Sequence, residues 1–217
     1  MNSPSAEVQR DAAGCVAAHA RLVAAIGGLS DDQARQPSQL PDWTVGHVLS
    51  HLARNADGLV GMIDGAARGE VVPQYPSVEA RTRGIEEGAG RPAAELVDHV
   101  RTSIERLEQR WHEADAATWA GNGLTIGGPT PVAELPWRRW REVEVHHADL
   151  GLGFSFEDWS DPYVRLELVR MQMLFASRKP MGMTALPPAA LAATPKRRLA
   201  WLMGRASIDG LQPAGIY

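Results

Sequence analysis

The chain has 217 residues, of which 44% are hydrophobic and 22% are charged, the composition of an ordinary globular protein large enough to bury a sizeable core. Its formal net charge is -4 and it has no long basic block, which argues against nucleic acid as a partner. There is no signal-peptide pattern and no run of 18 apolar residues, and the single cysteine, Cys15, rules out an internal disulfide, so we expect a cytoplasmic protein without a membrane span.

Apolar residues recur at spacings of three and four in the first part of the chain, which predicts amphipathic helices there. The first helix starts near Val8 and ends at Gly27. Cys15 lies on its apolar stripe, so we interpret this thiol as a small buried side chain rather than a nucleophile. A second helix follows Thr44, the expected N-cap, and a third follows Pro92, which suits a first turn.

The second helix carries two histidines four residues apart, His47 and His51. At about 100° per residue His51 flanks the apolar stripe, whereas His47 lies nearly opposite its centre. Helical geometry therefore favours His51 as the histidine that reaches into the protein. The alternative is a pair of solvated histidines.

A glycine-rich stretch at residues 116–131 has few helix signals and predicts a long loop, with a short β-hairpin as one option. It leads into a fourth helix, residues 136–150, in which Glu142 and His146 are four residues apart. Side chains at this spacing share a helix face, about 5–6 Å apart at Cβ, so both can reach one ion. His146 lies roughly 40° and Glu142 roughly 80° from the centre of the apolar stripe, on the flank expected to face other helices.

Other charged residues of the fourth helix have simpler interpretations. Glu144 falls about 120° from the centre of the stripe and is expected to face water. Asp149 is either a partner that orients a ligand or a surface charge near the helix end. Arg138, Arg139 and Arg141 either steer an anionic substrate or form a solvated basic turn, and we interpret them as the second.

Four long amphipathic helices indicate an all-α bundle, and bundles place metal sites between facing helices. His51, Glu142 and His146 would supply two imidazoles and one carboxylate, and such a set leaves an open coordination position as in catalytic zinc sites. Iron uses the same ligand types. From these residues alone, a buried salt bridge between glutamate and histidine is the other interpretation.

The last third of the chain has a different character. Helical patterns recur at residues 158–177 and 196–203, and residues 208–217 are expected to form a short strand or an extended segment. This part is too small and too rich in loops to have a large core of its own.

Three segments carry a resemblance to a known family: LPDWTVGHVLSHLARN at residues 40–55, REVEVHHADLGLG at residues 141–153 and WLMGR at residues 201–205. With them the chain resembles the mycothiol-dependent maleylpyruvate isomerases of the DinB-like metal-dependent hydrolase superfamily. The resemblance implies a mainly α fold, with a DinB-like metal-binding four-helix bundle at residues 1–155 and a small C-terminal α/β domain at residues 156–217.

The same resemblance implies a divalent ion, usually zinc, on His51, Glu142 and His146. The family's C-terminal arginine is implicated at the active site and is matched here by Arg205, which would suit a substrate carboxylate. The expected partners are therefore a small anionic substrate and a low-molecular-weight thiol.

The implied reaction converts maleylpyruvate to fumarylpyruvate by reversible addition of a thiolate. Because Cys15 is poorly suited to supply the sulfur, the thiol is expected to be mycothiol, a cosubstrate that a bound metal would deprotonate. Two other hypotheses remain. One is a mycothiol-dependent S-transferase that acts on another electrophile, and the other is a non-catalytic, ligand-sensing bundle without a metal.

Overall fold

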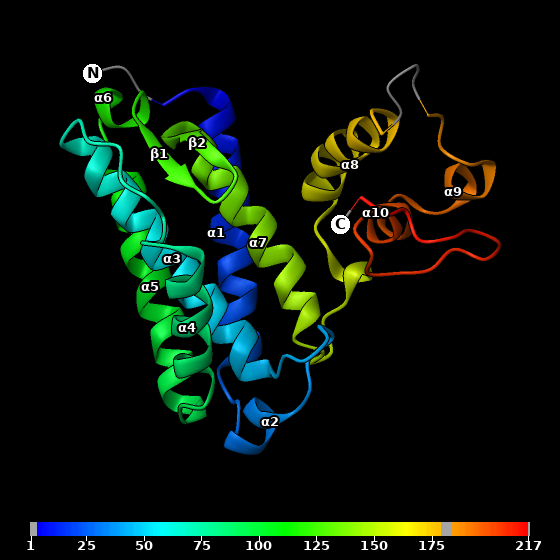
Figure 1. Ribbon diagram of the computed structural model, residues 1–217, viewed down its shortest axis with the longest axis horizontal. Helices are drawn as coiled ribbons and strands as arrows, with labels where there is room; N and C mark the ends of the chain where they lie inside the picture. The colour runs from blue at the N-terminus through cyan, green and yellow to red at the C-terminus, as the bar shows by residue number, and fades with distance from the viewer. Residues whose placement is uncertain (1–3, 179–183, 217) are drawn as a thin grey trace. The chain divides into compact units, whose positions relative to one another are not determined.

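The computed structural model describes residues 4–178 and 184–216, and the chain divides into two compact units, Met1–Leu152 and Gly153–Tyr217 (Figure 1). The boundary expected from the sequence, at residues 155 and 156, lies a few residues further along. In the first unit the elements are α1 (Ala6–Ile26), α2 (Asp31–Arg35), α3 (Val45–Ala67), α4 (Val78–Ala89), α5 (Ala93–Glu113), α6 (Ala116–Trp119), β1 (Asn122–Thr125), β2 (Gly128–Pro131), η1 (Val132–Glu134) and α7 (Leu135–Asp149). In the second they are η2 (Phe156–Asp158), α8 (Asp161–Ala176), α9 (Pro188–Ala192) and α10 (Pro195–Leu202).

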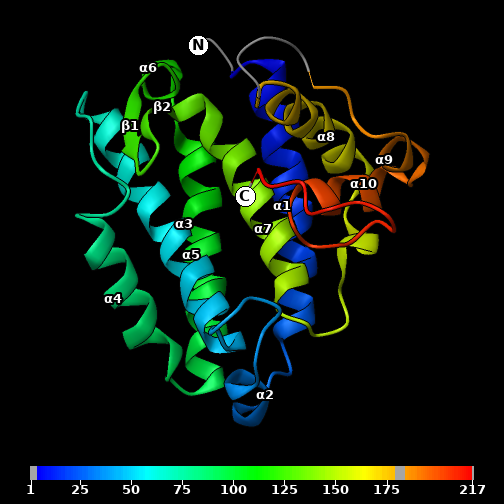
Figure 2. The ribbon, with the colours of Figure 1, turned by 45° about the vertical axis from the view of Figure 1, so that its right-hand side comes forward.

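Helices α1, α3, α5 and α7 form a four-helix bundle, so the mainly helical fold predicted from the sequence is confirmed (Figures 1 and 2). Helix α3 packs mainly against α5, and α1 packs mainly against α7. The apolar stripes meet in a common interior whose fully buried side chains include Leu22, Leu49, Leu107 and Val143. This interior fixes the faces that α3 and α7 turn toward each other.

Helix α4 packs against α3 at close range because glycines remove side chains from the contact. A Cβ atom on Gly46 of α3 would lie 2.3 Å from the backbone oxygen of Ala89, at the end of α4. A Cβ atom on Gly88 of α4 would lie 2.2 Å from the Ser50 hydroxyl of α3. The separation of the two helices therefore depends on glycine on both sides.

The close contact makes a prediction for stability. Gly46→Ala should lower the free energy of unfolding by about 1–3 kcal/mol, because the methyl group meets a backbone atom that cannot rotate away. Gly61→Ala, on the same helix with no atom within 4 Å of its added Cβ, should instead raise it by up to about 1 kcal/mol through helix propensity. Urea unfolding of the metal-free protein measures both, and equal effects would contradict the close contact.

The stretch at residues 116–131 contains α6 and an antiparallel hairpin, β1 with β2, in which Asn122 pairs with Pro131. The loop that leads into α4 lies against the outer edge of β1. The Gln74 N–H donates to the Leu124 carbonyl at 2.8 Å, and the Leu124 N–H donates to the Val72 carbonyl at 3.1 Å. The loop and the hairpin are thus tied together by their backbones.

In the second unit α10 packs against α8 and η2. Its described residues contain helices and no strand, so the β structure expected in the C-terminal domain is not found there. Residues 208–216 of the expected strand lack regular structure, and residue 217 lies outside the described part. The reason is local: Gly210 and Gly215 have φ of 74° and 65°, and Pro213 has no N–H for a strand ladder. Across the described residues no helix is both long and apolar enough to span a membrane.

Candidate metal centre

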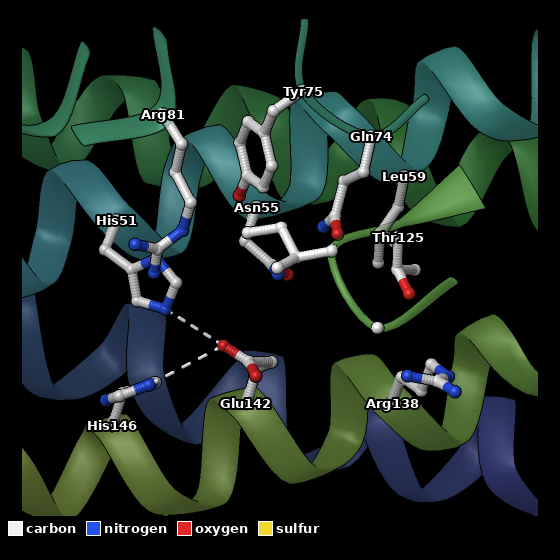
Figure 3. Close-up of a pocket in the computed structure, with 12 residues that line it drawn as sticks. His51, Asn55, Leu59, Gln74, Tyr75, Arg81, Thr125, Arg138, Glu142 and His146 are labelled. Atoms are coloured by element: carbon white, nitrogen blue, oxygen red, sulfur yellow. Dashed lines mark hydrogen bonds and ion pairs between the residues drawn. The ribbon is translucent and has the colours of Figure 1, made fainter. Parts of the chain in front are cut away.

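Three side chains from two facing helices converge on one point in the first unit (Figure 3). His51 comes from α3, and Glu142 and His146 come from adjacent turns of α7. The Glu142 Oε2 atom lies 2.9 Å from His51 Nε2 and 3.6 Å from His146 Nε2. One ligand atom from each of the three residues lies within 4.8 Å of the other two. The structure therefore brings together the three residues that the sequence proposed as ligands.

The start of α3 sets the direction of His51. The Thr44 hydroxyl accepts a hydrogen bond from the His47 N–H, and the His47 side chain bonds back to the Thr44 backbone, which closes a capping box. One turn later His51 is 4% exposed, with the Trp43 ring centroid 5.8 Å away. His47 instead pairs with Glu86 at 3.1 Å, nearer the surface. Of the two histidines, His51 is the inward one, as the helical pattern predicted.

The arrangement fits a divalent ion. Zinc binds imidazole nitrogen and carboxylate oxygen at about 2.0–2.2 Å, which places tetrahedral ligand atoms roughly 3.3 Å apart. The distances from Glu142 Oε2 to the two Nε2 atoms, 2.9 and 3.6 Å, bracket that value. Two imidazoles and one carboxylate leave a fourth position for a substrate or cosubstrate.

The protonation states also suit a metal. Burial lowers the pKa of His51 to about 4, so its imidazole is neutral at neutral pH. Burial alone would raise the pKa of Glu142, but the hydrogen bond from His51 and the positive charges around it, that of Arg139 among them, outweigh burial and hold this pKa well below its usual range. The cluster therefore offers a carboxylate beside a neutral imidazole, the forms that bind a metal.

Two further residues contact the outer nitrogens of the histidines. Asp149 Oδ2 lies 2.9 Å from His146 Nδ1, and the Asp149 side chain is buried, so it is a close partner of this histidine rather than a surface charge. On the other side, Arg81 Nη2 lies 3.3 Å from His51 Nδ1. His146 thus has a hydrogen-bond acceptor near its Nδ1 atom, and His51 has a hydrogen-bond donor near its Nδ1 atom.

The cluster borders a cavity of about 290 Å³ in the first unit. Polar side chains of its wall come from α3, the loop before α4, α4 itself and the hairpin: Asn55, Gln74, Tyr75, Arg81 and Thr125. Figure 3 shows Arg81 and Tyr75 extending toward the histidine–glutamate cluster from the side opposite α7. Asn55 ends the segment at residues 40–55, but no motif of the sequence contains Gln74, Tyr75, Arg81 or Thr125, because a polar residue in a loop, a hairpin or a short helix has no periodic signal.

The prediction that Glu144 faces water is wrong. Its side chain is 1% exposed, and its Oε1 atom accepts hydrogen bonds from Arg21 Nη2 at 2.7 Å and from Trp140 Nε1 at 3.0 Å. The reason is that α7 is covered on more than one side, since α1 packs along a second flank that a single apolar stripe does not reveal. Arg21 of α1 supplies the charge that makes this burial tolerable.

The interpretation of the arginines as a solvated turn is wrong for Arg139, which is fully buried. Its Nε donates to His19 Nε2 at 3.0 Å, and its Nη1 donates to the Leu52 carbonyl at 2.8 Å and to Asn55 Oδ1 at 2.9 Å. These acceptors lie on α1 and α3, so one guanidinium joins three helices of the bundle. Arg138, by contrast, is 45% exposed and pairs with Glu134 at 3.5 Å.

The remaining candidates lie elsewhere. Cys15 is fully buried, which raises the pKa of its thiol, so the interpretation of a small buried side chain holds. Arg205 lies in the second unit, where its Nη1 donates to the Met203 carbonyl at 2.9 Å. Its contribution to the site stays a prediction.

Comparison with known proteins supports the resemblance seen in the sequence. A family model described as the mycothiol maleylpyruvate isomerase N-terminal domain matches residues 15–151. Crystal structures of a mycothiol-dependent maleylpyruvate isomerase and of a histidine-to-alanine mutant of that enzyme have TM-scores of 0.81 and 0.80; in both cases the identity is 23%, over 92% of this chain and 90% of the other. No curated protein matches. At this identity the likeness to the crystal structures shows a shared fold.

Proposed function

Because the chain belongs to the mycothiol maleylpyruvate isomerase N-terminal domain family, we propose that it is an enzyme that converts maleylpyruvate to fumarylpyruvate with mycothiol as the thiol cosubstrate and a divalent ion, zinc, at its centre. One observation carries the proposal: His51, Glu142 and His146 converge at the wall of a cavity inside the matched region. A buried salt bridge alone would need neither the third residue nor an adjoining cavity.

In this proposal the two histidines and Glu142 hold the ion, and Asp149 fixes the ring of His146. When bound, zinc acts as a Lewis acid that favours the thiolate form of a thiol in the open position. The chain itself supplies no suitable sulfur, because Cys15 is buried on α1 and burial disfavours its thiolate. The nucleophile is therefore an external thiol.

The reaction balances without an oxidant or a net proton transfer. The thiolate sulfur forms a bond to one alkene carbon of maleylpyruvate, and the electron pair of the double bond moves toward the conjugated ketone. The former double bond is now single and rotates. The electron pair then returns, the carbon–sulfur bond breaks, and the thiolate leaves with the trans alkene formed.

A turnover assay tests the proposal. We expect the purified, zinc-loaded protein to isomerise maleylpyruvate when mycothiol is present, and to show no activity above background without mycothiol or after the zinc is removed by a chelator. Metal content is measured on the same samples, so that loss of activity is compared with loss of zinc.

The outcomes separate the alternatives. Stoichiometric zinc with no isomerisation would refute the isomerase, and the assay would then turn to mycothiol conjugation of other electrophiles, as the S-transferase hypothesis predicts. Protein that binds no divalent ion would refute both enzymes and favour the ligand-sensing bundle. Equal activity with and without mycothiol would refute the thiol mechanism.

A further inference from the structure

We propose that Arg81, with the Tyr75 hydroxyl beside it, binds a carboxylate of the substrate next to the metal cluster. The inference rests on the proposed function and names a residue pair in the first unit as the anion-binding part of the cavity. The resemblance to the family pointed instead to Arg205 in the second unit for this task.

Arg81 lies in the first turn of α4 and lines the cavity. Its Cζ atom lies 5.9 Å from the centroid of the Tyr75 ring, and its Nη2 lies 3.3 Å from His51 Nδ1. No carboxylate of the described residues forms an ion pair with it. The other arginine of the cavity wall, Arg138, is already paired with Glu134. Arg81 therefore is the guanidinium in this wall whose charge is not matched by a neighbouring acid.

The contact with His51 is incompatible with a loaded metal site. A guanidinium only donates hydrogen bonds, so His51 Nδ1 accepts from Arg81 and the ring proton is on Nε2, which donates to Glu142. A histidine that binds a metal through Nε2 carries its proton on Nδ1 and needs an acceptor there. The His51 Nδ1–H and the Arg81 guanidinium would then be two donors that face each other. We infer that Arg81 gives up this contact when a metal binds, and its guanidinium becomes available to an anion.

Tyr75 supplies a second donor at the same place. Its hydroxyl oxygen is buried, makes no hydrogen bond of good geometry among the described residues, and has the Arg81 guanidinium as a close polar neighbour. A buried hydroxyl that makes no hydrogen bond of good geometry costs free energy, which suggests that it donates a hydrogen bond to a bound ligand. Its position is well fixed, because the preceding residue, Gln74, is bonded through its backbone to β1. Figure 3 shows Tyr75 and Arg81 side by side above Glu142.

The chemistry of the two donors points to a carboxylate. The planar guanidinium donates two parallel hydrogen bonds to the oxygens of a carboxylate, and a tyrosine hydroxyl donates a third. Maleylpyruvate carries carboxylates at both ends. Because Arg81 lines the same cavity as His51, Glu142 and His146, a carboxylate on Arg81 would hold one end of the substrate beside the metal cluster.

Binding of maleate, a dicarboxylate that lacks the ketone, tests the inference without turnover. Isothermal titration calorimetry is run on zinc-loaded wild type and on Arg81→Gln, Arg81→Lys, Tyr75→Phe and Arg83→Gln, with zinc content and circular dichroism measured for each. Arg83 is an exposed arginine of the same helix and controls for the loss of one positive charge.

We expect Arg81→Gln to weaken maleate binding by about 10- to 100-fold and Tyr75→Phe by about 3- to 10-fold, with full zinc content. Arg81→Lys should recover only part of the lost affinity, because a lysine ammonium cannot donate two parallel hydrogen bonds to a carboxylate. Arg83→Gln should bind maleate as tightly as wild type. In the turnover assay Arg81→Gln should raise KM for maleylpyruvate more than it lowers kcat.

Folded, zinc-loaded Arg81→Gln that binds maleate as tightly as wild type would overturn the inference, as would a wild type that turns over maleylpyruvate but binds no maleate. Failure of the proposed function looks different. If maleate binding depends on Arg81 but the protein does not isomerise maleylpyruvate, the anion site is supported. Only the proposal that maleylpyruvate is the substrate is then refuted.

Discussion

Glu142→Gln should abolish stoichiometric binding of a divalent ion and, with it, the thiol-dependent turnover. Glutamine keeps the size of the side chain and an oxygen that accepts from His51 Nε2, but it removes the negative charge. Loss of an outer partner of a metal ligand already costs 10- to 100-fold in affinity, so loss of a direct ligand should cost more than about 100-fold. Equilibrium dialysis against zinc and metal analysis measure the change.

Glu86→Gln is a matched control for this experiment. Glu86 also pairs with a histidine of α3, His47, at 3.1 Å, but it lies outside the cluster. This variant should bind one zinc per chain with the affinity of wild type. Thermal melting of the metal-free proteins shows whether each variant is folded. If folded Glu142→Gln binds zinc as tightly as wild type, the metal site is elsewhere and the proposed function loses its main support.

Periodicity predicted the bundle and the direction of His51 because both depend on one repeating apolar face. The stripe after Thr44 fixes which side of α3 is buried, and the capping box fixes where the helix begins. The spacing of Glu142 and His146 fixes a shared face on α7. The local sequence pattern was therefore sufficient to nominate these three residues, although it left a buried salt bridge as the other interpretation.

Glu144 and Arg139 were misplaced because their partners are distant in sequence. Glu144 accepts from Arg21, 123 residues earlier, and Arg139 donates to His19, 120 residues earlier. A helical wheel identifies the most apolar side of a helix, but α7 contacts both α1 and α3. Charged residues on its other flanks are then buried with polar partners that only the folded bundle brings near.

The residues of the cavity wall could not be predicted from the sequence for a different reason. Arg81 and Tyr75 come from the start of α4 and the loop before it, where no spacing rule relates a side chain to the cluster. Their positions follow from the glycine contacts between α3 and α4 and from the backbone bonds between the loop and β1. These are long-range features, so no local pattern indicated that Arg81 contacts His51.

Arg139→Met should lower the free energy of unfolding by about 3–5 kcal/mol, although it replaces a buried cation by an apolar side chain of similar length. Two effects oppose each other. Removing the charge relieves a desolvation cost of several kcal/mol, but the wild-type guanidinium recovers part of that cost through three hydrogen bonds, while its Nη2 has no partner among the described residues. In the variant, His19 Nε2, the Leu52 carbonyl and Asn55 Oδ1 lose the guanidinium donor while they remain buried. An acceptor left unsatisfied costs about 1–3 kcal/mol, and the Leu52 carbonyl costs less because it stays in the backbone hydrogen-bond ladder of α3.

The orphaned acceptors should decide the outcome, because α1 and α3 cannot both shift to admit water without breaking the packing around Leu22 and Leu52, which are fully buried. Urea unfolding of the metal-free protein measures the effect. Arg138→Met, one residue away and 45% exposed, controls for loss of charge on α7 and should change stability by less than about 0.5 kcal/mol. If Arg139→Met were as stable as wild type, the desolvation of Arg139 would outweigh its hydrogen bonds. The buried arginine would then have to be explained by its charge beside Glu142, which helps to keep that carboxylate ionised, rather than by the stability of the bundle.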